Sequence, residues 1–472
     1  MAKVLVTGAN GFIGSHLVRE LLKRGNEVVG LVRKTSDLSA LSGLPVALYI
    51  GDVRELSSLT APMQGVEYVY HLAAVLLGTS EEEFMDTNVR GTQNMLEAAQ
   101  QSAKDTLKRF LYVSSQAGAG PSSSITPMDE TAERRPISWY GTSKMKAEDV
   151  VLSYNDHIPV TIVRPSPVYG ERERDISQTF AIINQHIQPR LGIQPKYSVM
   201  VYVGDLVRGF IDAAESDKSI GQTYFLNHPR LLTTGEVVKS IATALNKPDG
   251  IMFPVPIPLV GLAAPLAEAM HHFSRERPAT TRDKVKELSQ SFWAADSLKA
   301  RHDFGWEAKT DLVSGMKPTT AYYFEEQRQL AEMALETVKS RWLKYLTVAV
   351  GLGIFIEISS ATGKFYTFTP GWFVFVIIFA AFGFGLGTLA MLLRKKSGLV
   401  QLLAGTILAG AVELANALAL IPGVRWDFAA GWPFGITDPI LRSVVLGFAG
   451  GIFLLVVNAI MKAIYKRRLK MG

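Results

Sequence analysis

The beginning of the chain combines an apolar run, three glycines and a segment with helical spacing. Residues 3–7 are mostly apolar over the length of a strand, and they lead directly into Gly8, Gly11 and Gly14. In residues 15–23 the apolar side chains lie three and four positions apart, on one face of a helix: Leu17, Val18, Leu21 and Leu22. This pattern predicts a strand, a tight glycine turn and a helix.

Four further apolar runs of strand length follow before residue 115, at 27–32, 46–49, 66–72 and 110–113. Turn residues or segments with helical spacing separate them. Strands that alternate with helices are typical of a parallel sheet with helices on both faces. We therefore predict an α/β fold, a doubly wound parallel sheet, with a cofactor site at the carboxyl ends of its strands.

The glycine turn predicts a site for the pyrophosphate of a dinucleotide. Gly8 permits the turn, Gly11 has no side chain to hold a pyrophosphate away from the backbone, and Gly14 lets the helix pack close to the strand. The helix N-terminus then presents free N–H groups and the positive end of its dipole to the phosphates. A purely structural turn is the alternative. The predicted contacts are Gly8, Asn10, Gly11, Phe12, Ile13 and Gly14.

Polar and small residues after the next strands predict the rest of the cofactor site. Arg33 stands where an acidic residue would bind a ribose 2′-hydroxyl; an arginine suits a 2′-phosphate, so NADP is preferred and NAD stays open. The alternative is a solvated arginine. Asp52 can accept a hydrogen bond from the adenine amino group, unless it only forms a turn. The predicted contacts here are Arg33, Asp52, Val53, Leu72, Ala73, Ala74 and Asn88.

A serine, a tyrosine and a lysine form the candidate catalytic set. Tyr140 and Lys144 are four residues apart and share one face of a helix. A tyrosine alone has a pKa of about 10, and a nearby lysine ammonium lowers that pKa by stabilising the phenolate. Ser115, at a strand end, would hydrogen-bond the substrate oxygen. His71 is a further candidate, although a histidine packed at a strand end is the favoured interpretation.

Residues 1 to about 325 resemble the extended short-chain dehydrogenase/reductase family, of the NAD-dependent epimerase/dehydratase type. The residues that carry the resemblance are Thr7 to Gly14, Gly51-Asp52, His71 to Ala74, Asn88-Val89, Gly91-Thr92, Ser114-Ser115, Tyr140, Lys144 and Arg164 to Gly170. The resemblance implies a Rossmann fold, with a cofactor-binding core over about 1–170 and a small substrate-binding subdomain mostly over 171–325.

The resemblance also implies roles for individual residues. Ser115, Tyr140 and Lys144 would be the catalytic triad, and Tyr140 and Lys144 would also contact the cofactor. Pro167 and Val168 would lie against its nicotinamide. The family usually continues the catalytic serine into a Val-Tyr-Gly segment, which this chain replaces, so the substrate loop is altered.

Two features distinguish branches within this family. Sugar-nucleotide epimerases and dehydratases usually carry an arginine that binds the substrate diphosphate, and Ser198 occupies that position here. The later motifs, Arg277-Pro278-Ala279 and Phe304-Gly305-Trp306 among them, are closer to 3β-hydroxysteroid dehydrogenases and dihydroflavonol reductases. Lys196 could still serve a phosphate, so the sugar-nucleotide alternative stays open. Residues 254–270 are apolar and predict either a helix over the substrate subdomain or an interfacial segment.

The last part of the chain changes composition abruptly. Residues 326–344 predict an amphipathic connecting helix. Within 345–472 four apolar runs follow, at 345–358, 372–393, 399–421 and 443–461, and the second is uncharged over about 20 positions, enough to cross a bilayer. Basic residues mark alternate ends of these runs. By the positive-inside rule the chain is an integral membrane protein whose C-terminal all-α transmembrane bundle leaves both termini and the catalytic domain cytoplasmic.

Two acidic residues lie inside these apolar runs. An acidic side chain within a membrane is costly, so Glu357 and Glu413 are candidates for function. The alternative is that each lies near the end of a span or is paired within the bundle. The stretch from Glu413 to Asp438 weakly resembles the VanZ-like membrane family. This resemblance implies only a small integral bundle.

Charge and composition narrow the functional classes. The net charge is +6, but the basic clusters flank the apolar runs, so we expect the lipid bilayer and no nucleic acid as a partner. The chain has no cysteine, which excludes disulfides, thiolate catalysis and cysteine metal sites; no metal site is predicted. A homodimer is a candidate assembly.

Three functions remain after these observations. The first is a membrane-anchored NAD(P)-dependent oxidoreductase that interconverts a secondary alcohol and a ketone on an amphiphilic small molecule, steroid or isoprenoid in kind. The second is a nucleotide-sugar epimerase or dehydratase. The third is a cofactor-binding sensor or assembly factor without catalysis. The presence of both Tyr140 and Lys144 favours an enzyme.

Overall fold

The structure is a computed structural model that describes residues 1–173, 176–184, 186–258, 260–261, 264–265, 281–329 and 332–333. The chain divides into two compact units, Met1–Gln327 and Arg328–Gly472. The four predicted membrane spans, and most of the predicted connecting helix, lie outside the described residues. Among the residues that are described, no helix has the length and apolar character needed to cross a membrane.

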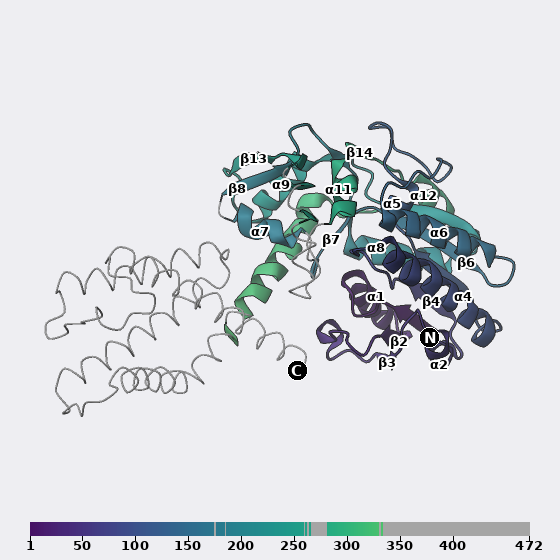
Figure 1. Cartoon of the computed structure of the whole chain (residues 1–472). Helices are drawn as coiled ribbons and strands as arrows, with labels where there is room; N and C mark the ends of the chain where they lie inside the picture. The colour runs from purple at the N-terminus through teal and green to yellow at the C-terminus, as the bar shows by residue number, and fades with distance from the viewer. Residues whose placement is uncertain are drawn as a thin grey trace, which may run out of the picture. The chain divides into compact units, whose positions relative to one another are not determined.

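A seven-stranded sheet with the order β11-β6-β5-β4-β1-β2-β3 forms the centre of the first unit (Figure 1). All of its pairings are parallel. Its strands are β1 Lys3–Thr7, β2 Glu27–Val32, β3 Ala47–Ile50, β4 Tyr68–His71, β5 Arg109–Val113, β6 Val160–Pro165 and β11 Gln222–Leu226. The predicted parallel α/β sheet is confirmed, and its strand order reverses between β1 and β4.

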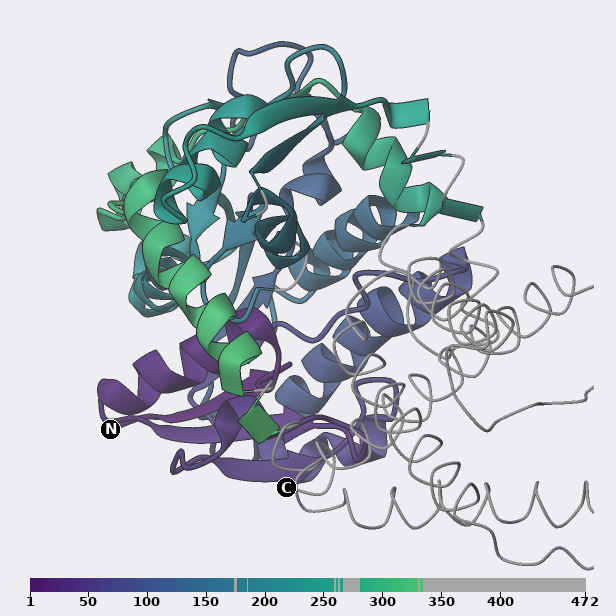
Figure 2. The same cartoon turned by 90° about the vertical axis from the view of Figure 1, so that its left-hand side faces the viewer.

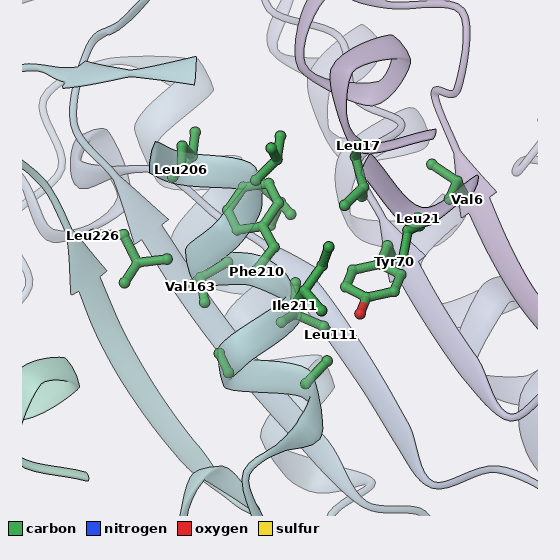
Figure 3. Close-up of a cluster of buried hydrophobic side chains, with 14 of the residues drawn as sticks. Val6, Leu17, Leu21, Tyr70, Leu111, Val163, Leu206, Phe210, Ile211 and Leu226 are labelled. Atoms are coloured by element: carbon green, nitrogen blue, oxygen red, sulfur yellow. The ribbon is translucent and has the colours of Figure 1, made fainter. Parts of the chain in front are cut away.

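Helices pack on both faces of this sheet (Figure 1 and Figure 2). One face carries α1 Phe12–Lys23, α8 Val203–Glu215 and α12 Leu298–Phe304, and the other carries α2 Thr60–Met63, α4 Gly91–Ser102 and α6 Trp139–Ser153. Figure 3 shows how the first face is filled: side chains of α1 and α8 meet side chains of the strands beneath them. The labelled residues are Val6, Leu17, Leu21, Tyr70, Leu111, Val163, Leu206, Phe210, Ile211 and Leu226. Leu206 and Phe210 lie four residues apart, on one face of α8, and both side chains are completely buried.

A π-helical turn interrupts the helical segment that follows β4. The segment consists of α3 Glu81–Phe84, the π-helix η3 Met85–Arg90 and α4. The wider turn contains Asn88, one of the predicted site residues. Such turns are frequent at functional sites, because they redirect a side chain that a regular helix would place elsewhere.

The remaining described part of the first unit is built from short strands and helices. Its strands are β7 Val168–Tyr169, β8 Ile187–Leu191, β9 Tyr197–Ser198, β10 Val201–Tyr202, β12 Leu232–Thr233, β13 Ile251–Val255 and β14 Phe292–Trp293. Its longer helices are α7 Ser177–Ile183, α9 Thr234–Ala244 and α11 Arg282–Ser289, and the short helical turns of the unit are α5 Gln116–Ala119, η1 Ser39–Leu41, η2 Leu56–Ser58 and η4 Asp217–Ser219. Residues 312–329 add a helix, green in Figures 1 and 2. A separate apolar cluster that includes Phe180, Ile241 and Met316 forms the core of this part.

The apolar segment 254–270, predicted as a helix or an interfacial segment, begins with the end of a strand. Its first two residues belong to strand β13, which pairs in parallel with β8. Of its later residues, 257–258, 260–261 and 264–265 are helical, and 259, 262–263 and 266–270 lie outside those described.

Candidate active site

The glycine turn leaves its backbone open at the start of α1. Gly8 has φ +67°, a left-handed conformation that favours glycine. A Cβ on Gly14 would overlap the carbonyl group of Gly8, whereas a Cβ on Gly11 would meet only the Gly8 carbonyl oxygen, at 3.1 Å. Gly11 is exposed, and α1 begins at the next residue, Phe12. The N-terminus of α1 therefore has accessible backbone in front of it, as the binding of a pyrophosphate requires.

Asn10 and the small residues after β4 lie at the same end of the sheet. The Asn10 amide donates to the Asp37 carbonyl oxygen at 3.1 Å, which ties the glycine turn to the loop after β2. The backbone after β4 passes close to Gly8, since a Cβ on Gly8 would come within 3.1 Å of the Ala73 nitrogen. Ile13, Leu72 and Ala74 are half-buried around this turn.

The adenosine end of the edge is exposed. Arg33 follows β2 with its side chain in solvent, and its guanidinium makes no hydrogen bond to any described residue. Asp52 follows β3 and accepts two hydrogen bonds from the Arg54 side chain, at 3.0 and 2.7 Å, which hold the pKa of that carboxyl below its usual value. Arg33 lowers the same pKa more weakly. Sequence reasoning missed Arg54, although its position two residues after Asp52 is typical of a local turn.

Val53 connects this end of the edge to the helix that contains Asn88. Its side chain is buried against Gly91, where a Cβ would come within 2.7 Å of it. Its carbonyl oxygen accepts a hydrogen bond from Asn94 at 2.9 Å.

His71 is enclosed between two threonines. Its Nδ1 lies 2.7 Å from the Thr7 hydroxyl and its Nε2 lies 3.0 Å from the Thr92 hydroxyl. Because Thr92 donates to the Asn88 carbonyl oxygen, it accepts from Nε2–H, and Nδ1 is the acceptor for Thr7. Complete burial, with a smaller contribution from Lys144, lowers the pKa of His71 to about 3. A neutral, fully bonded histidine of this kind fits the structural interpretation.

The structure brings Ser115, Tyr140 and Lys144 together. Ser115 caps α5, and its Oγ accepts a hydrogen bond from the Ala117 N–H at 3.1 Å, so its own proton is free to be donated. Burial raises the pKa of Tyr140 above its ordinary value, and the nearby Ser115 hydroxyl acts in the opposite direction.

Lys144 lies one helical turn beyond Tyr140 and is 2% exposed. Its Nζ donates to the Val113 carbonyl oxygen at 2.6 Å and lies 4.5 Å from the centre of the Tyr112 ring. Burial lowers the pKa of Lys144 to about 7, while Glu148 on the same helix acts in the opposite direction. This lysine therefore changes charge near neutral pH, and a nearby phosphate, hydroxyl or phenolate favours its charged form.

Asn88 connects the π-helical turn to the catalytic helix. Its amide donates to the Val75 carbonyl oxygen at 3.0 Å and to the Ser143 hydroxyl at 2.9 Å, and its oxygen accepts from the Val75 N–H at 2.8 Å. Ser143 in turn donates to the Tyr140 carbonyl oxygen at 2.7 Å. Asn88 was predicted as a cofactor contact, and the contacts that the structure contains are with protein groups beside the catalytic residues.

A buried ion pair lies behind the catalytic lysine. Glu148, one turn after Lys144, accepts two hydrogen bonds from Arg164 at 2.9 and 2.7 Å and one from Ser114 at 2.5 Å. Both charged groups are almost completely buried. The pair positions Ser114 and therefore the strand end that carries Ser115. Sequence reasoning missed it, although the repeat from Tyr140 through Lys144 to Glu148 along one helix face was visible.

Two polar groups beside this site have no protein partner. Gln116, directly after Ser115, is 2% exposed, and neither atom of its carboxamide has a hydrogen-bond partner among the described residues. The same is true of the buried hydroxyl of Ser166. Ser166 precedes Pro167, which is exposed, and Val168, which is half-buried. Buried polar groups normally have a partner, so the two are candidates to bind a ligand.

The fold and this site define an enzyme that works with a nicotinamide dinucleotide, an NAD-dependent oxidoreductase or epimerase. The chain belongs to the NAD dependent epimerase/dehydratase family, whose model matches residues 4–226. It is 30% identical over 265 residues to a 3-beta-hydroxysteroid dehydrogenase of Mycolicibacterium neoaurum, in an alignment that covers 52% of this chain and 71% of that protein.

Two further comparisons extend over more of the chain. The chain is 28% identical over 332 residues to the N-acetyl-alpha-D-glucosaminyl-diphospho-ditrans,octacis-undecaprenol 4-epimerase of Escherichia coli, covering 68% of this chain and 95% of that protein. The structure of dTDP-glucose 4,6-dehydratase from Bacillus anthracis in complex with NAD is 21% identical and has a TM-score of 0.56, covering 70% of this chain and 98% of that one. The second comparison indicates a shared fold.

Proposed function

We propose that the protein is a membrane-anchored NAD(P)-dependent oxidoreductase that interconverts a secondary alcohol and a ketone on a lipid-like substrate. The observation that carries this proposal is that Ser115, at the end of β5, lies beside Tyr140, with Lys144 one helical turn further along α6. The pair lies at the carboxyl end of a parallel sheet whose first turn has the open backbone that a dinucleotide needs.

These side chains can carry the proton that accompanies hydride transfer. When bound, the nicotinamide cofactor accepts or supplies the hydride. In alcohol oxidation the Tyr140 phenolate takes the hydroxyl proton, and in ketone reduction the neutral phenol returns a proton to the carbonyl oxygen. Ser115 donates a hydrogen bond to the same substrate oxygen as its charge develops. Burial raises the pKa of Tyr140, and in the proposed mechanism a charged Lys144 favours the phenolate and acts against this effect.

The cofactor preference that we propose is NADP over NAD. Arg33 is exposed after β2 and its guanidinium has no hydrogen bond to any described residue, so we propose that it binds a 2′-phosphate with two hydrogen bonds. Asp52 is held in place by Arg54 and keeps lone pairs for the adenine amino group.

The substrate half favours an apolar substrate over a nucleotide diphosphate. Ser198 replaces the arginine of the sugar-nucleotide enzymes, and its hydroxyl bonds to the Val199 carbonyl oxygen. The Lys196 ammonium, the other candidate for a phosphate, donates to the backbone oxygens of Ser289 and Gln290 at 2.8 and 2.9 Å. A steroid dehydrogenase and an undecaprenol-linked epimerase are among the relatives.

An exposed apolar strand also supports this substrate class. Ile251, Met252 and Phe253 of β13 are 77%, 43% and 58% exposed, and they lead into the apolar segment 254–270. An amphiphile that enters from a bilayer would meet such a surface. We propose that substrate entry follows this surface and that four spans in 345–472 keep the catalytic unit at the membrane, where the local concentration of a lipid is high.

Substrate specificity is tested with the full chain in detergent and NADP(H). Sterol and isoprenoid alcohols and ketones are offered beside UDP- and dTDP-sugars, and turnover is followed by the change in nicotinamide absorbance. Turnover on the apolar set supports the proposal. Epimerisation is detected by product analysis, and if it is confined to the sugar nucleotides the protein is a nucleotide-sugar epimerase. Cofactor binding without turnover on either set of compounds would identify a sensor.

Membrane anchoring is tested separately. Reporters fused after Met461 and after Ser397 are expected on the cytoplasmic side, and one at Gly431 on the outside. Since the chain has no cysteine, a fluorophore can also be attached at a single Phe253→Cys substitution in nanodiscs with nitroxide-labelled lipids. We expect stronger quenching there than at Ile50→Cys, a site that is 71% exposed on β3. Equal quenching at the two sites would contradict entry along β13.

A further inference from the structure

The N-terminus of the catalytic helix is capped from a distant part of the chain. Helix α6 begins at Trp139, so the N–H groups of Trp139 and Tyr140 have no partner within the helix. The Trp139 N–H lies 3.0 Å from both carboxylate oxygens of Asp283, and the Tyr140 N–H lies 3.4 Å from one of them. Asp283 belongs to α11, 143 residues further along the chain than Tyr140.

A second carboxylate of α11 completes this cap. The Ser138 hydroxyl accepts a hydrogen bond from the Gly141 N–H at 2.9 Å and donates one to Glu287 at 2.6 Å. Asp283 is 5% exposed and Glu287 is 8% exposed. The first turn of α6, which contains the reactive tyrosine, is therefore held by two buried carboxylates rather than by its own side chains alone.

Lysines on α11 balance the two buried charges. Lys286 lies 3.2 Å from Asp283 and its Nζ is 5.2 Å from the centre of the Trp139 ring, while Lys284 lies 2.7 Å from Glu287. Each carboxylate thus has a lysine partner on its own helix: Asp283 also accepts from Trp139 and Tyr140 of α6, and Glu287 from the N-cap residue Ser138. Removing Asp283 would leave the N–H groups of Trp139 and Tyr140 without their acceptor, and removing Glu287 would leave the Ser138 hydroxyl without its acceptor. A shift of the helix would relieve such a loss in a buried position.

We propose that Asp283 and Glu287 are positioning residues for Tyr140, and that they make the setting of the catalytic helix depend on the docking of α11. A carboxylate at a helix N-terminus is stabilised by the helix dipole, so the interaction is strong enough to hold α6 in one position. Tyr140 is the second residue of the helix, so a small tilt of this turn moves its hydroxyl relative to Ser115 and the substrate oxygen. The proposal rests on the proposed function, because it assumes that Tyr140 carries the proton.

The steady-state test uses Asp283→Ala and Asp283→Asn in the full chain. We expect Asp283→Ala to lower kcat by about 10- to 100-fold, because small displacements of a reacting group have effects of that size. The affinity for the nicotinamide cofactor should stay within about twofold of wild type, since Asp283 is not at the cofactor edge. Asp283→Asn retains one acceptor oxygen, so its kcat should lie between those of the wild type and Asp283→Ala. A kcat within twofold of wild type in Asp283→Ala would overturn the proposal.

The matched control is Glu236→Ala. Glu236 caps α9 through Thr233 in a capping box within the same half of the unit, and it makes no contact with α6. Loss of this cap should lower Tm, as the loss of a helix cap does, and leave kcat unchanged. If both variants lost kcat equally, the effect would be one of general stability and the proposal would be wrong.

The pH dependence provides a readout that a purely structural cap would not change. The charged groups around Tyr140 are Lys144 on its own helix and Asp283 and Glu287 on α11 with their lysines, and α3 contributes the Phe84 ring. The charge of Glu287 raises the pKa of Tyr140. The rate of alcohol oxidation rises with pH as the Tyr140 phenolate forms. In Glu287→Gln this rise should therefore occur at lower pH than in the wild type. A rise at the same pH as in the wild type would contradict the positioning role.

Failure of the proposed function gives a different pattern. If Tyr140→Phe keeps full turnover, the tyrosine is not the proton carrier and the proposed function itself is wrong. If Tyr140→Phe is inactive while Asp283→Ala and Glu287→Gln behave as wild type, only the positioning role is wrong.

Discussion

The two ends of the cofactor edge differ in burial and in bonding. At the catalytic end His71, Asn88 and Lys144 are at most 2% exposed, and each makes hydrogen bonds to protein groups. At the adenosine end Arg33 is in solvent without a hydrogen bond to any described residue, and Asp52 is bonded only to its local turn. A change at the catalytic end leaves a buried group without a partner, whereas a change at the adenosine end alters only what binds there.

The difference separates two kinds of specificity. Hydrogen bonds join η3, β5 and α11 to α6, and under the proposed function the chemistry depends on this network. Under the same proposal, cofactor choice depends on one or two exposed side chains. Substitutions at the two ends should therefore differ in both the size and the kind of their effects.

The largest effect is expected for Tyr140→Phe. Removing the phenol hydroxyl removes the proton carrier, so kcat should drop by about 100- to 10,000-fold. The affinity for the nicotinamide cofactor should be nearly unchanged, and it is measured by the quenching of protein fluorescence. A variant with the turnover of wild type would shift the interpretation to a sensor.

Asn88→Ala should cause the next largest effect. The substitution leaves the buried N–H and C=O of Val75 without partners, which costs about 2–4 kcal/mol of unfolding free energy. It also frees Ser143 beside Lys144, so kcat should decrease as well. The control is Asn94→Ala, which loses a single bond to the Val53 carbonyl oxygen. Denaturant unfolding and kcat are measured for both, and equal effects would contradict the special role of the π-helical turn.

Lys144→Met should change the pH dependence of stability. The folded pKa of Lys144 is about 7, below its unfolded value of about 10.4. Between these values the unfolded state binds more protons, so wild-type stability rises with pH by up to about 1.4 kcal/mol per unit, and the penalty is fully present below pH 7. The variant should lack this slope in Tm measured from pH 6 to 10, and it should also lose turnover. Parallel Tm profiles would show that Lys144 is not strained by burial.

The smallest effect is expected at the adenosine end. Arg33→Asp should weaken NADP(H) binding by about tenfold or more and improve NAD(H) binding, because a charge-assisted contact to the 2′-phosphate is replaced by an acceptor for the 2′-hydroxyl. Tm and kcat at saturating cofactor should stay close to wild type. The neighbouring exposed Lys34→Asp is the control for net charge. A strong preference of the wild-type protein for NAD(H) would contradict the role of Arg33.

Most of the central fold could be predicted from local patterns. The alternation of apolar runs and helical spacing indicated five strands of the sheet and the glycine turn, because each signal lies within a few residues. Strands β6 and β11, which extend the sheet on one side, were not predicted. Residues 254 and 255 belong to a strand, whereas the described residues 257–258, 260–261 and 264–265 are helical, as one interpretation of 254–270 expected. A short apolar run does not distinguish these alternatives, since pairing partners decide between them.

By itself the sequence determined which residues can carry the chemistry: the glycines of the turn, the serine at the end of β5, and a tyrosine and a lysine at helical spacing. Only the tertiary structure decided what surrounds them. The bond from Asn88 to Ser143 spans 55 residues, and the cap from Asp283 to Trp139 spans 144. Neither has a period or a spacing along the chain, because a buried polar group takes its partner from whichever element packing brings near, and that depends on the whole fold.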